Sequence, residues 1–534
     1  MSKTTKKQTF LHGAALLAIA TAVVKVIGAF YKIPLKMIIG DQGYSYFITA
    51  YDIYAVLLMI STAGLPIAMS QMISKASSLG HYNQVRRVYN TSRAIFLGLG
   101  IASTALMMGF AHSLAAFQKQ PDAWVAIFCL GPCAFLICVM STYRGFSQGL
   151  GDMRPTSNSQ ILEAVFKLLV GLVLALVVIK TTNSVAYAAG AAIFGVTVSC
   201  IVSSVYLKGQ TWSAYRELPA AQDTPLSYRT TAKQLLAVAV PITIGSAGLQ
   251  VLTVIETNLY MGQLLTANGM SQTTADITKG IYNMAQTVYN MPCAFTVPIT
   301  TSVLPAITAQ LTVGNYTGAK ATEESAARIT GLLTFPCAVG LCVLAKPVMA
   351  LLGGYSGENL DLAGELMFLL GVAVLFYGAI QYTNVVLQSH GYAHIPVINT
   401  LICGAMKLVV VYLLVGNPNI GISGAPIGMI VCYLCISLMN LIAIAKVVPQ
   451  KVKIMRNLLR PALPAVLMGA AVWGVYQILL ALLGAEGSRI LLCGIPVATG
   501  VCVYFVSVVF CKVLSREDCL LLPKGEKIAK LLRL

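Results

Sequence analysis

The sequence predicts an all-α membrane protein with many spanning helices, and three observations lead to this fold class. Of the 534 residues, 57% are hydrophobic and only 10% are charged, whereas soluble domains carry about 25% charged residues. Apolar runs of about 20 residues recur along the chain, and this is the length of a helix that crosses a bilayer. Basic residues gather in alternate connecting segments, as they do on the cytoplasmic side of membrane proteins.

The apolar runs predict about fourteen membrane spans. Each is expected to be a helix, because backbone groups in lipid must form their hydrogen bonds within their own segment. The first run is expected to be retained rather than cleaved as a signal peptide, since Lys25 interrupts it and no small-residue cleavage site follows. The predicted spans cover residues 10–33, 45–72, 91–117, 123–147, 157–180, 184–207, 233–257, 279–306, 325–350, 362–388, 395–416, 423–446, 461–484 and 489–513.

The net charge of +18 is explained by topology. If the N-terminus is cytoplasmic, most Lys and Arg residues fall in cytoplasmic segments, and the C-terminus is then cytoplasmic as well. The aromatic and basic interleaving of a nucleic-acid surface is missing, so we expect no nucleic-acid partner. The 14 cysteines lie mostly inside apolar runs, and no Gly-rich phosphate loop occurs. Cys432 and Cys435 form a CxxC, but in the middle of a span this spacing is expected to serve packing rather than metal or redox chemistry. We therefore expect no cofactor and no nucleotide-driven step.

Two halves of the sequence match at an offset of about 240 residues. A single pairing is weak, because Gly, Pro and Gln are common in membrane spans, but several pairings at one offset indicate an internal duplication. Each half also has a Gly-x-Tyr turn, which begins at Gly80 and at Gly314. The paired residues are Leu65-Pro66 with Leu304-Pro305, Gln71 with Gln310, Gln148 with Gln388, Gly151 with Gly391, and Lys167 with Lys407.

The duplication predicts two pseudo-symmetric six-helix lobes, at residues 1–207 and 233–446, related by an axis along the membrane normal. A cytoplasmic linker, 208–232, joins them, and residues 447–513 add two transmembrane helices. The tail, 514–534, has basic residues three apart with apolar residues between them. It is expected either to lie as an amphipathic helix on the anionic inner leaflet or to be a solvated end.

Charged residues lie inside the predicted spans, where lipid favours only hydrocarbon. Lys167 and Lys407 occupy matching places in the two halves, about 15–18 Å from the cytoplasmic start of their helices at ~1.5 Å per residue. This depth is near the middle of a hydrocarbon core about 30 Å thick. A charge there costs at least about 2.5–3.5 kcal/mol. Both lysines are therefore expected to face a protein interior or a watery cavity.

These intramembrane charges have two interpretations. Glu163 lies four residues before Lys167 and shares its helix face, and Lys25 and Asp52 lie at similar depths, so both pairs are candidates for ion pairs that fix helix packing. Alternatively, the lysines line a cationic cavity between the lobes that holds an anionic headgroup. Lys407 has no local acid, which favours this second interpretation.

Three stretches resemble a known family: "VKVIGAFYKIPLKMIIGDQGYSYF", "GLPIAMSQMISK" and "YRGFSQGLGDMRPTSNSQILE". They are similar to the stage V sporulation protein B-like branch of the multidrug/oligosaccharidyl-lipid/polysaccharide (MOP) exporter superfamily, which includes MurJ-like lipid II flippases. The resemblance implies two six-helix lobes with two further helices, and a bacterial cytoplasmic membrane. It also implies that Lys25, in "VKVIGA", handles substrate, with Lys32 as a second basic residue and Lys279 near a third family position that is uncharged here.

The predicted function is a transporter, and not an enzyme, that flips a lipid-linked oligosaccharide on undecaprenyl pyrophosphate, or a peptidoglycan precursor such as lipid II, by alternating access. The predicted substrate-binding residues are Lys25, Lys32, Lys167, Lys407 and Arg144, although Arg144 also fits the positive-inside rule. Asp52 and Glu163 are predicted to pair with these cations or to bind a coupling proton or sodium ion; the membrane potential is the other candidate driving force. Membrane lipids are the remaining expected partners.

Three alternatives remain open. An ion-coupled multidrug exporter would need carboxylates for cationic drugs, whereas lysines here equal or outnumber them. A polysaccharide polymerase or glycosyltransferase would need a sizeable outer loop, and the predicted outer loops are short. The third alternative is a scaffold for envelope or spore-wall assembly. The sequence leaves open whether the role belongs to vegetative growth or to sporulation.

Overall fold

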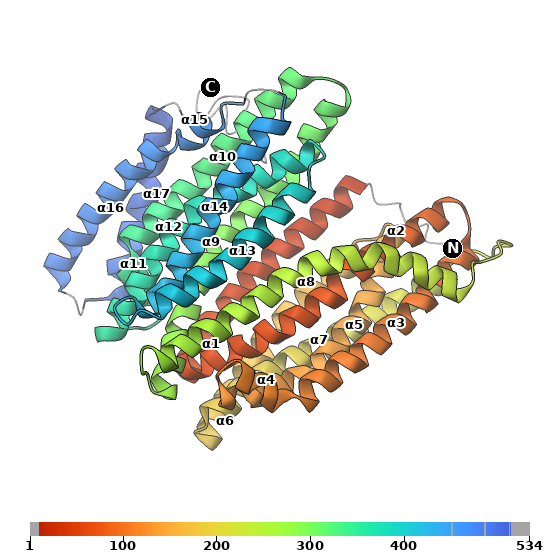
Figure 1. Ribbon diagram of the computed structural model, residues 1–534, viewed down its shortest axis with the longest axis horizontal. Coiled ribbons are helices and arrows are strands. Elements are labelled where there is room, and N and C mark those ends of the chain that lie inside the picture. Colours follow the sequence, from red (N-terminus) through yellow and green to blue (C-terminus); the bar gives the residue numbers. More distant parts are fainter. Residues whose placement is uncertain (1–9, 450–451, 485–486, 512, 514–534) are drawn as a thin grey trace. The chain divides into compact units, whose positions relative to one another are not determined.

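The computed structural model describes residues 10–449, 452–484, 487–511 and 513, and in this part of the chain it contains helices and no strand. The all-α prediction is confirmed (Figure 1). Residues 514–534, predicted to be a basic tail, lie outside the described residues.

The helices follow one another with short connections (Figure 1). The first group comprises α1 (Phe10–Met59), the π-helix η1 (Ile60–Gly64), α2 (Leu65–Ser78), α3 (Tyr82–Gly109), α4 (Ala111–Phe117), the short 3-10 helix η2 (Pro121–Ala123), α5 (Trp124–Gly149), α6 (Arg154–Thr182), α7 (Val185–Arg216) and α8 (Tyr228–Thr266). The second group comprises α9 (Gln272–Thr312), α10 (Tyr316–Val343), α11 (Ala345–Leu352), α12 (Gly357–Ser389), α13 (His394–Val415), the 3-10 helix η3 (Gly421–Ser423), α14 (Gly424–Val447), α15 (Ile454–Leu459), α16 (Ala462–Leu483) and α17 (Arg489–Phe510).

Among the described residues, 12 helical segments are long and apolar enough to cross a membrane. One of them, Phe30–Ser78, contains a bend at Gly40, where φ is 69° and ψ is −179°. Only glycine adopts this backbone conformation without strain, so α1 consists of two arms that run in different directions. α9 is not among the 12 but has 41 residues, which is also long enough to span. With the two arms and α9 counted separately, the number agrees with the fourteen spans predicted.

The duplication is visible in the turns that join the helices. Gly80 and Gly314 both have positive φ, 74° and 73°, and so do Gly151 and Gly391, at 85° and 86°. All four turns have the same hydrogen-bond pattern, in which two successive N–H groups bond to carbonyls of the preceding last helical turn. At Gly151 these distances are 3.0 and 3.0 Å, and at Gly391 they are 3.1 and 2.9 Å. This is the Schellman pattern of helix ends, and the two halves use it at the positions paired in the sequence.

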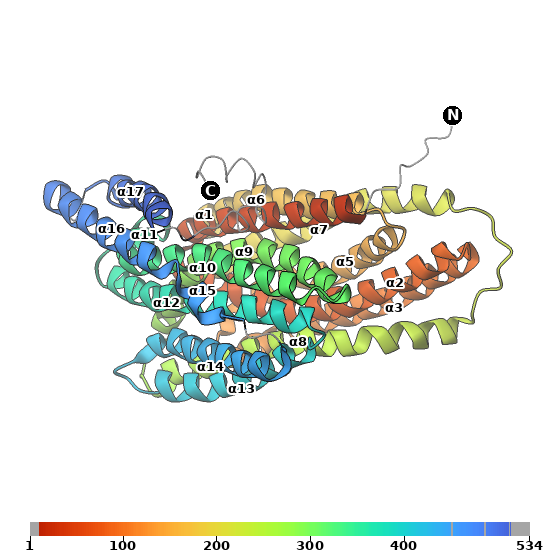
Figure 2. The ribbon, with the colours of Figure 1, turned by 90° about the horizontal axis from the view of Figure 1, so that it is seen from above.

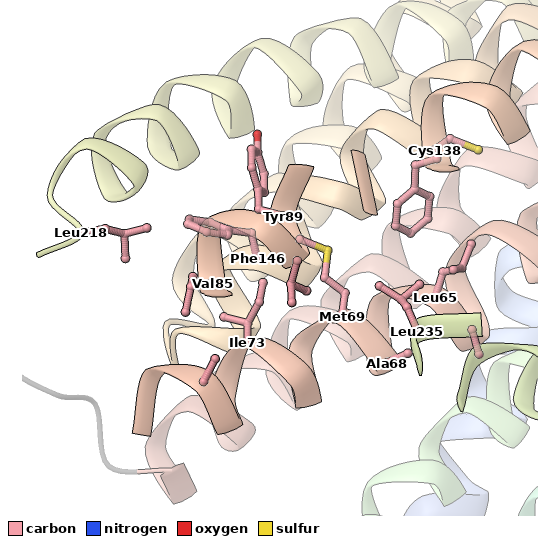
Figure 3. Close-up of a cluster of buried hydrophobic side chains, with 14 residues drawn as sticks. Leu65, Ala68, Met69, Ile73, Val85, Tyr89, Cys138, Phe146, Leu218 and Leu235 are labelled. Carbon is pink, nitrogen blue, oxygen red and sulfur yellow. The ribbon is translucent and has the colours of Figure 1, made fainter. Parts of the chain in front are cut away.

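By its internal contacts the chain divides into two units, Met1–Gly280 and Ile281–Leu534. In the first unit, a core cluster joins α2, α3, α5 and α8, and Figure 3 shows Tyr89 and Phe146 beside one another in it. The ring centroids of these two residues are 4.9 Å apart. A Cβ atom on Gly64 would lie 2.1 Å from the carbonyl oxygen of Ala239, so glycine at that position allows α8 to pack against η1.

The connection between α7 and α8 is shorter and better anchored than the predicted linker. Only residues 217–227 are non-helical, and Figure 2 shows them as the loop at the right that joins the two helices. Asp223 accepts hydrogen bonds from the backbone N–H groups of Asn83 (3.0 Å) and Gln84 (2.8 Å) at the start of α3. Leu218 belongs to the core cluster of α2, α3, α5 and α8 (Figure 3). We call residues 217–227 the strap.

These hydrogen bonds change the titration of Asp223. Desolvation acts to raise the pKa of this partly buried carboxyl, but the backbone donors of Asn83 and Gln84 stabilise its ionised form, and the net result is a pKa below the ordinary value. The strap is therefore held in part by an ionised carboxylate at a helix N-terminus.

In the second unit, a core cluster joins the end of α9 with α10, α12, α14 and the start of α15. The added helices α16 and α17 pack on one another and on α10 and α11. The segment before α15 binds back to the start of α10, since Glu324 accepts a hydrogen bond from the backbone of Lys453 at 3.3 Å. The contact pattern groups α8 and the start of α9 with the first unit, whereas the lobe boundary at 208–232 stays a prediction.

Candidate substrate-binding site

A group of charged side chains lies inside the first unit, on helices that are predicted to span the membrane. The two arms of α1 carry Lys32 and Asp52, and α6 carries Lys167 and Glu163. All four side chains are partly accessible rather than sealed. Asp52 interacts electrostatically with Lys32, and also with Lys279 at the start of α9. Charges placed in a low-dielectric interior are stable only near such partners.

The bend of α1 brings the basic first arm close to the acidic second arm. Lys36 and Asp41 lie on opposite sides of Gly40 and form an ion pair with an N–O distance of 3.3 Å. Asp52 follows on the second arm and faces Lys32 from the first. The predicted pair of Asp52 with Lys25 stays a prediction, and the structure adds Lys32 as an electrostatic partner of Asp52. The side chain of Lys25 lies outside the described residues, and its predicted role stays a prediction.

Lys167 lies about halfway along α6, and its ammonium group is directed at aromatic rings. Its Nζ atom is 4.7 Å from the ring centroid of Tyr51 and 5.5 Å from that of Tyr31. A lysine over an aromatic face gains about 0.5–2 kcal/mol, most when it is desolvated. In the part of the chain that the structure describes, no carboxylate lies within ion-pair distance of Lys167, although Glu163 acts on it electrostatically.

The predicted local pair of Glu163 with Lys167 needs correction. Glu163 Oε2 accepts a hydrogen bond from the Arg144 guanidinium at 3.0 Å, and Arg144 also donates to Ser159 Oγ at 3.0 Å. Arg144 is near the end of α5, and the short turn to α6 places its planar, five-donor group beside two acceptors on the first turns of that helix. Arg144 therefore neutralises Glu163, and Lys167 is left without a direct carboxylate partner among the described residues.

Small residues allow α6 to approach its neighbours at the level of Lys167. A Cβ atom on Gly195 of α7 would lie 2.4 Å from Gly171 Cα, and one on Gly171 would lie 2.7 Å from the hydroxyl of Tyr31. Neither position has room for a side chain. This contact of α6 with α7 and α1 holds Lys167, one turn earlier on α6, against the rings of Tyr31 and Tyr51.

A second polar cluster, which the sequence reading missed, is fully sealed. Lys279 and Asp276 at the start of α9 and Gln120 between α4 and α5 are each 0% exposed. Lys279 Nζ donates to Gln120 Oε1 at 2.7 Å and also bonds to Thr49. Asp276 accepts from Gln120 Nε2 at 2.7 Å and from the Tyr46 hydroxyl at 2.9 Å. We call these five residues the sealed polar cluster.

The sealed cluster had a signal in the sequence. Asp276 and Lys279 are the charged residues of the α9 sequence, and they lie three positions apart on one helix face. The predicted span began at 279, so Asp276 was placed outside it and Lys279 at its edge. Glu256, on α8, is also buried, at 8% exposed, within the first unit. Because the sealed groups have no access to solvent, the partly accessible Lys32 and Lys167 are the better candidates for ligand contact.

Lys407, the predicted counterpart of Lys167, lies on α13 in the second unit and is partly accessible. It has an interaction partner within the protein, so it is not a bare charge. Among the described residues, no group of three or more His, Cys, Asp or Glu side chains is arranged to hold a metal ion.

A comparison with protein families identifies the family to which the chain belongs. The family model described as polysaccharide biosynthesis protein matches residues 10–310, which is more than half of the chain. The chain belongs to the polysaccharide biosynthesis protein family. The matched region contains the first unit from residue 10 onward, and with it the bend of α1, the charged site and the sealed polar cluster.

Characterised relatives of the chain are proteins of Bacillus subtilis (strain 168). The chain is 25% identical over 454 residues to stage V sporulation protein B, a match that covers 84% of this chain and 86% of that protein. It is 24% identical over 414 residues to the lipid II flippase MurJ, with 75% of this chain and 76% of that protein covered.

Solved structures match the fold of this family member. A lipid II flippase MurJ in an inward closed conformation gives a TM-score of 0.70 at 14% identity, covering 93% of this chain and 99% of that chain. An inward-facing multidrug resistance MATE family transporter of the MOP superfamily gives 0.59 at 18% identity, with 80% and 99% covered. The chain therefore shares the fold of these two solved structures, which are named as a flippase and as a multidrug resistance transporter.

Proposed function

We propose that this transporter flips a lipid-linked oligosaccharide on undecaprenyl pyrophosphate, or a peptidoglycan precursor such as lipid II, across the cytoplasmic membrane by alternating access. Its similarity to a protein named lipid II flippase supports the substrate class. The observation that carries the proposal is Lys167, a partly accessible ammonium group midway along a membrane helix, held over two tyrosine rings and without a carboxylate at ion-pair distance among the described residues.

The chemistry of a pyrophosphate headgroup fits this arrangement. Its negative charges cannot enter hydrocarbon unaided, so the transporter must replace the water around them with cations. Lys32 and Lys167 are accessible to a ligand and are the groups we assign to the phosphates. Arg144 is committed to Glu163 and is assigned a supporting role, in which it keeps that carboxylate from neutralising Lys167. Lys25 and Lys407 are proposed as further cationic contacts on the basis of the sequence.

Asp52 is proposed to balance the cations when no substrate is bound. It interacts electrostatically with Lys32, and a bound phosphate would compete with it for that lysine. Binding would then release Asp52, which could take up a coupling proton or sodium ion. We further propose that both termini are cytoplasmic, on the basis of the distribution of basic residues.

The test is movement of a fluorescent lipid-linked pyrophosphate disaccharide in proteoliposomes, followed by its accessibility to a membrane-impermeant quencher. Lys32→Met and Lys167→Met should each lower apparent substrate affinity about 10- to 100-fold, because a hydrogen bond to a charged group is worth about 1.5–3 kcal/mol. Lys167→Arg should keep most of the affinity. Lys180→Met, which removes an exposed lysine from the end of the same helix, is the matched control.

Substrate movement that survives the double replacement Lys32→Met, Lys167→Met unchanged would remove the cationic site from the mechanism. A second outcome separates the proposal from its alternative. The fold is shared with a MATE family transporter, and Asp52 and Glu163 are carboxylates of the kind that attract cationic drugs. If the vesicles export a cationic dye and leave the lipid-linked substrate in place, the multidrug exporter is the correct function.

A further inference from the structure

A buried carboxyl–imidazole pair lies in the second unit, on elements that contribute nothing to the charged site described above. Glu323, in the third turn of α10, is 0% exposed, and His390, in the turn between α12 and α13, has a 6% exposed side chain. His390 Nε2 and Glu323 Oε1 are 3.0 Å apart and share a hydrogen bond. By the predicted topology both residues lie at the cytoplasmic end of their helices.

The other oxygen of this carboxyl group is left without a donor. Glu323 Oε2 is buried and has no hydrogen-bond partner in the described part of the protein, and the hydroxyl of Tyr382 on α12, which acts on Glu323 electrostatically, is also buried and unbonded there. An ionised carboxylate that is buried with one bare oxygen is costly, whereas a protonated carboxyl removes the charge and gains a donor. The surroundings therefore favour the protonated form while the pair stays sealed.

The neighbouring groups also favour the protonated form of Glu323. Glu324, next on α10, acts on Glu323 as a like charge, and its own carboxylate is directed to the backbone of Lys453. Arg328, one turn further along α10, donates to Asn457 and Ser325 at 3.0 Å each. An apolar core cluster joins α9, α10, α12 and α14 in this unit, and its buried residues include Val303, Ile307, Val385, Val386 and Ile444.

His390 is neutral in this setting, since burial lowers its pKa below the ordinary value of 6.5. With a neutral imidazole, the pair has two states that differ by one proton: carboxylate with imidazole, and carboxyl with imidazole. The first carries one negative charge inside an apolar cluster, and the second carries none. A single proton thus decides whether the pair can remain buried.

We propose that the Glu323–His390 pair is a proton-binding site of this protein, separate from Asp52, occupied while the start of α10 is closed against the turn between α12 and α13 and emptied when that contact opens to the cytoplasm. The proposal rests on the proposed function for its role in transport, but the site itself does not. Opening would expose the carboxyl group to water, where it ionises and releases its proton to the cytoplasmic side. The protonation state of the pair would in this way be linked to the conformational cycle that moves substrate outward.

Infrared difference spectroscopy of the purified full-length protein tests the site without any substrate. At neutral pH the native protein should show the carbonyl band of a protonated carboxyl group, and Glu323→Gln should lose the intensity of one such group. Glu324→Gln, which removes the adjacent carboxylate, is the matched control and should keep the band. Glu323→Asp retains an acid, so it should retain a band that is shifted, and it serves if Glu323→Gln fails to fold.

The part played by His390 is tested by following this band against pH. His390→Gln should move its midpoint by up to about one pH unit, because a hydrogen bond of about 1 kcal/mol is replaced. His394→Gln, at the exposed start of α13, should leave the midpoint in place. A native spectrum identical to that of Glu323→Gln, or a midpoint indifferent to His390→Gln, overturns the assignment.

Transport then tests the coupling separately. In proteoliposomes an inward-directed proton gradient should accelerate movement of the lipid-linked substrate by the native protein and by Glu324→Gln, and not by Glu323→Gln. A normal response of Glu323→Gln to the gradient overturns the coupling role. If the native protein moves no lipid-linked substrate at all, the proposed function has failed, and the infrared result still decides whether the proton site exists.

Discussion

Replacement of Lys279 by methionine tests the sealed polar cluster, because it keeps the length of the side chain and removes its charge. Lys279 has no exposed surface and bonds to Gln120 and Thr49. Methionine would leave both acceptors with one donor fewer and would take away the cation that balances Asp276. Loss of one partner from a buried charged network costs about 3–5 kcal/mol.

This cost can be expressed as a change in thermal stability. The first unit ends at Gly280. Unfolding raises the entropy of a protein by about 2.1 cal/mol/K per residue, so a unit of this size has an unfolding entropy of about 0.6 kcal/mol/K. A loss of 3–5 kcal/mol then lowers the apparent midpoint of thermal unfolding by about 5–8 °C. The measurement is thermal unfolding of the purified protein in detergent, with Lys180→Met as a control that should shift the midpoint by less than about 1 °C.

A double-mutant cycle gives the sharper result. Asp276→Asn alone should also destabilise, since it leaves Lys279 as a buried charge, but Asp276→Asn together with Lys279→Met removes both charges. The double variant should therefore be more stable than the sum of the two single effects predicts, by about 1–3 kcal/mol. Additive effects, or a Lys279→Met protein with the native midpoint, would show that the cluster does not act as one charged network.

Two further predictions follow from packing and from titration. Gly195→Val should lower the thermal midpoint and disturb Lys167, because its Cβ would lie 2.4 Å from Gly171 Cα and overpacking costs at least about 1–3 kcal/mol. Gly209→Val is the control and should be neutral, since a Cβ there, on the same helix, meets nothing within 4 Å. Equal effects of the two substitutions would refute this reasoning. Folding lowers the pKa of Asp223. Its contribution to the stability of the folded strap is therefore full above the ordinary pKa of 3.8 and is lost as pH falls through the lower folded pKa. In limited proteolysis, Asp223→Asn should make the strap more sensitive to protease at neutral pH. At a pH below the folded pKa the variant and the native protein should be equally sensitive. A variant as resistant as the native protein at neutral pH would contradict the strap contact.

The number and placement of the spans could be predicted from the sequence because apolar length is a local property. The matching turns of the two halves were predictable for a similar reason, since Gly151 and Gly391 each end a helix in the same local pattern. The bend at Gly40 separates two predicted spans, but its continuation as one helical segment through Met59 was not expected.

Most contacts of the site were beyond sequence reasoning because they join distant positions. Lys279 and Gln120 are 159 residues apart, and Tyr46 and Asp276 are 230 apart, so no spacing rule connects them. Glu163 was assigned to Lys167 because residues four apart share a helix face. The preferred partner, Arg144, lies 19 residues earlier across a turn and offers a planar group that lysine lacks.

The four glycine turns at helix ends have a consequence for how sequences of the family can vary. At Gly80, Gly151, Gly314 and Gly391 the direction of the chain depends on left-handed backbone geometry and main-chain bonds, and not on any neighbouring side chain. Side chains around these turns can therefore vary while each helix end keeps the same local direction. Saturation mutagenesis should find these four sites intolerant of Val or Ile in both halves alike.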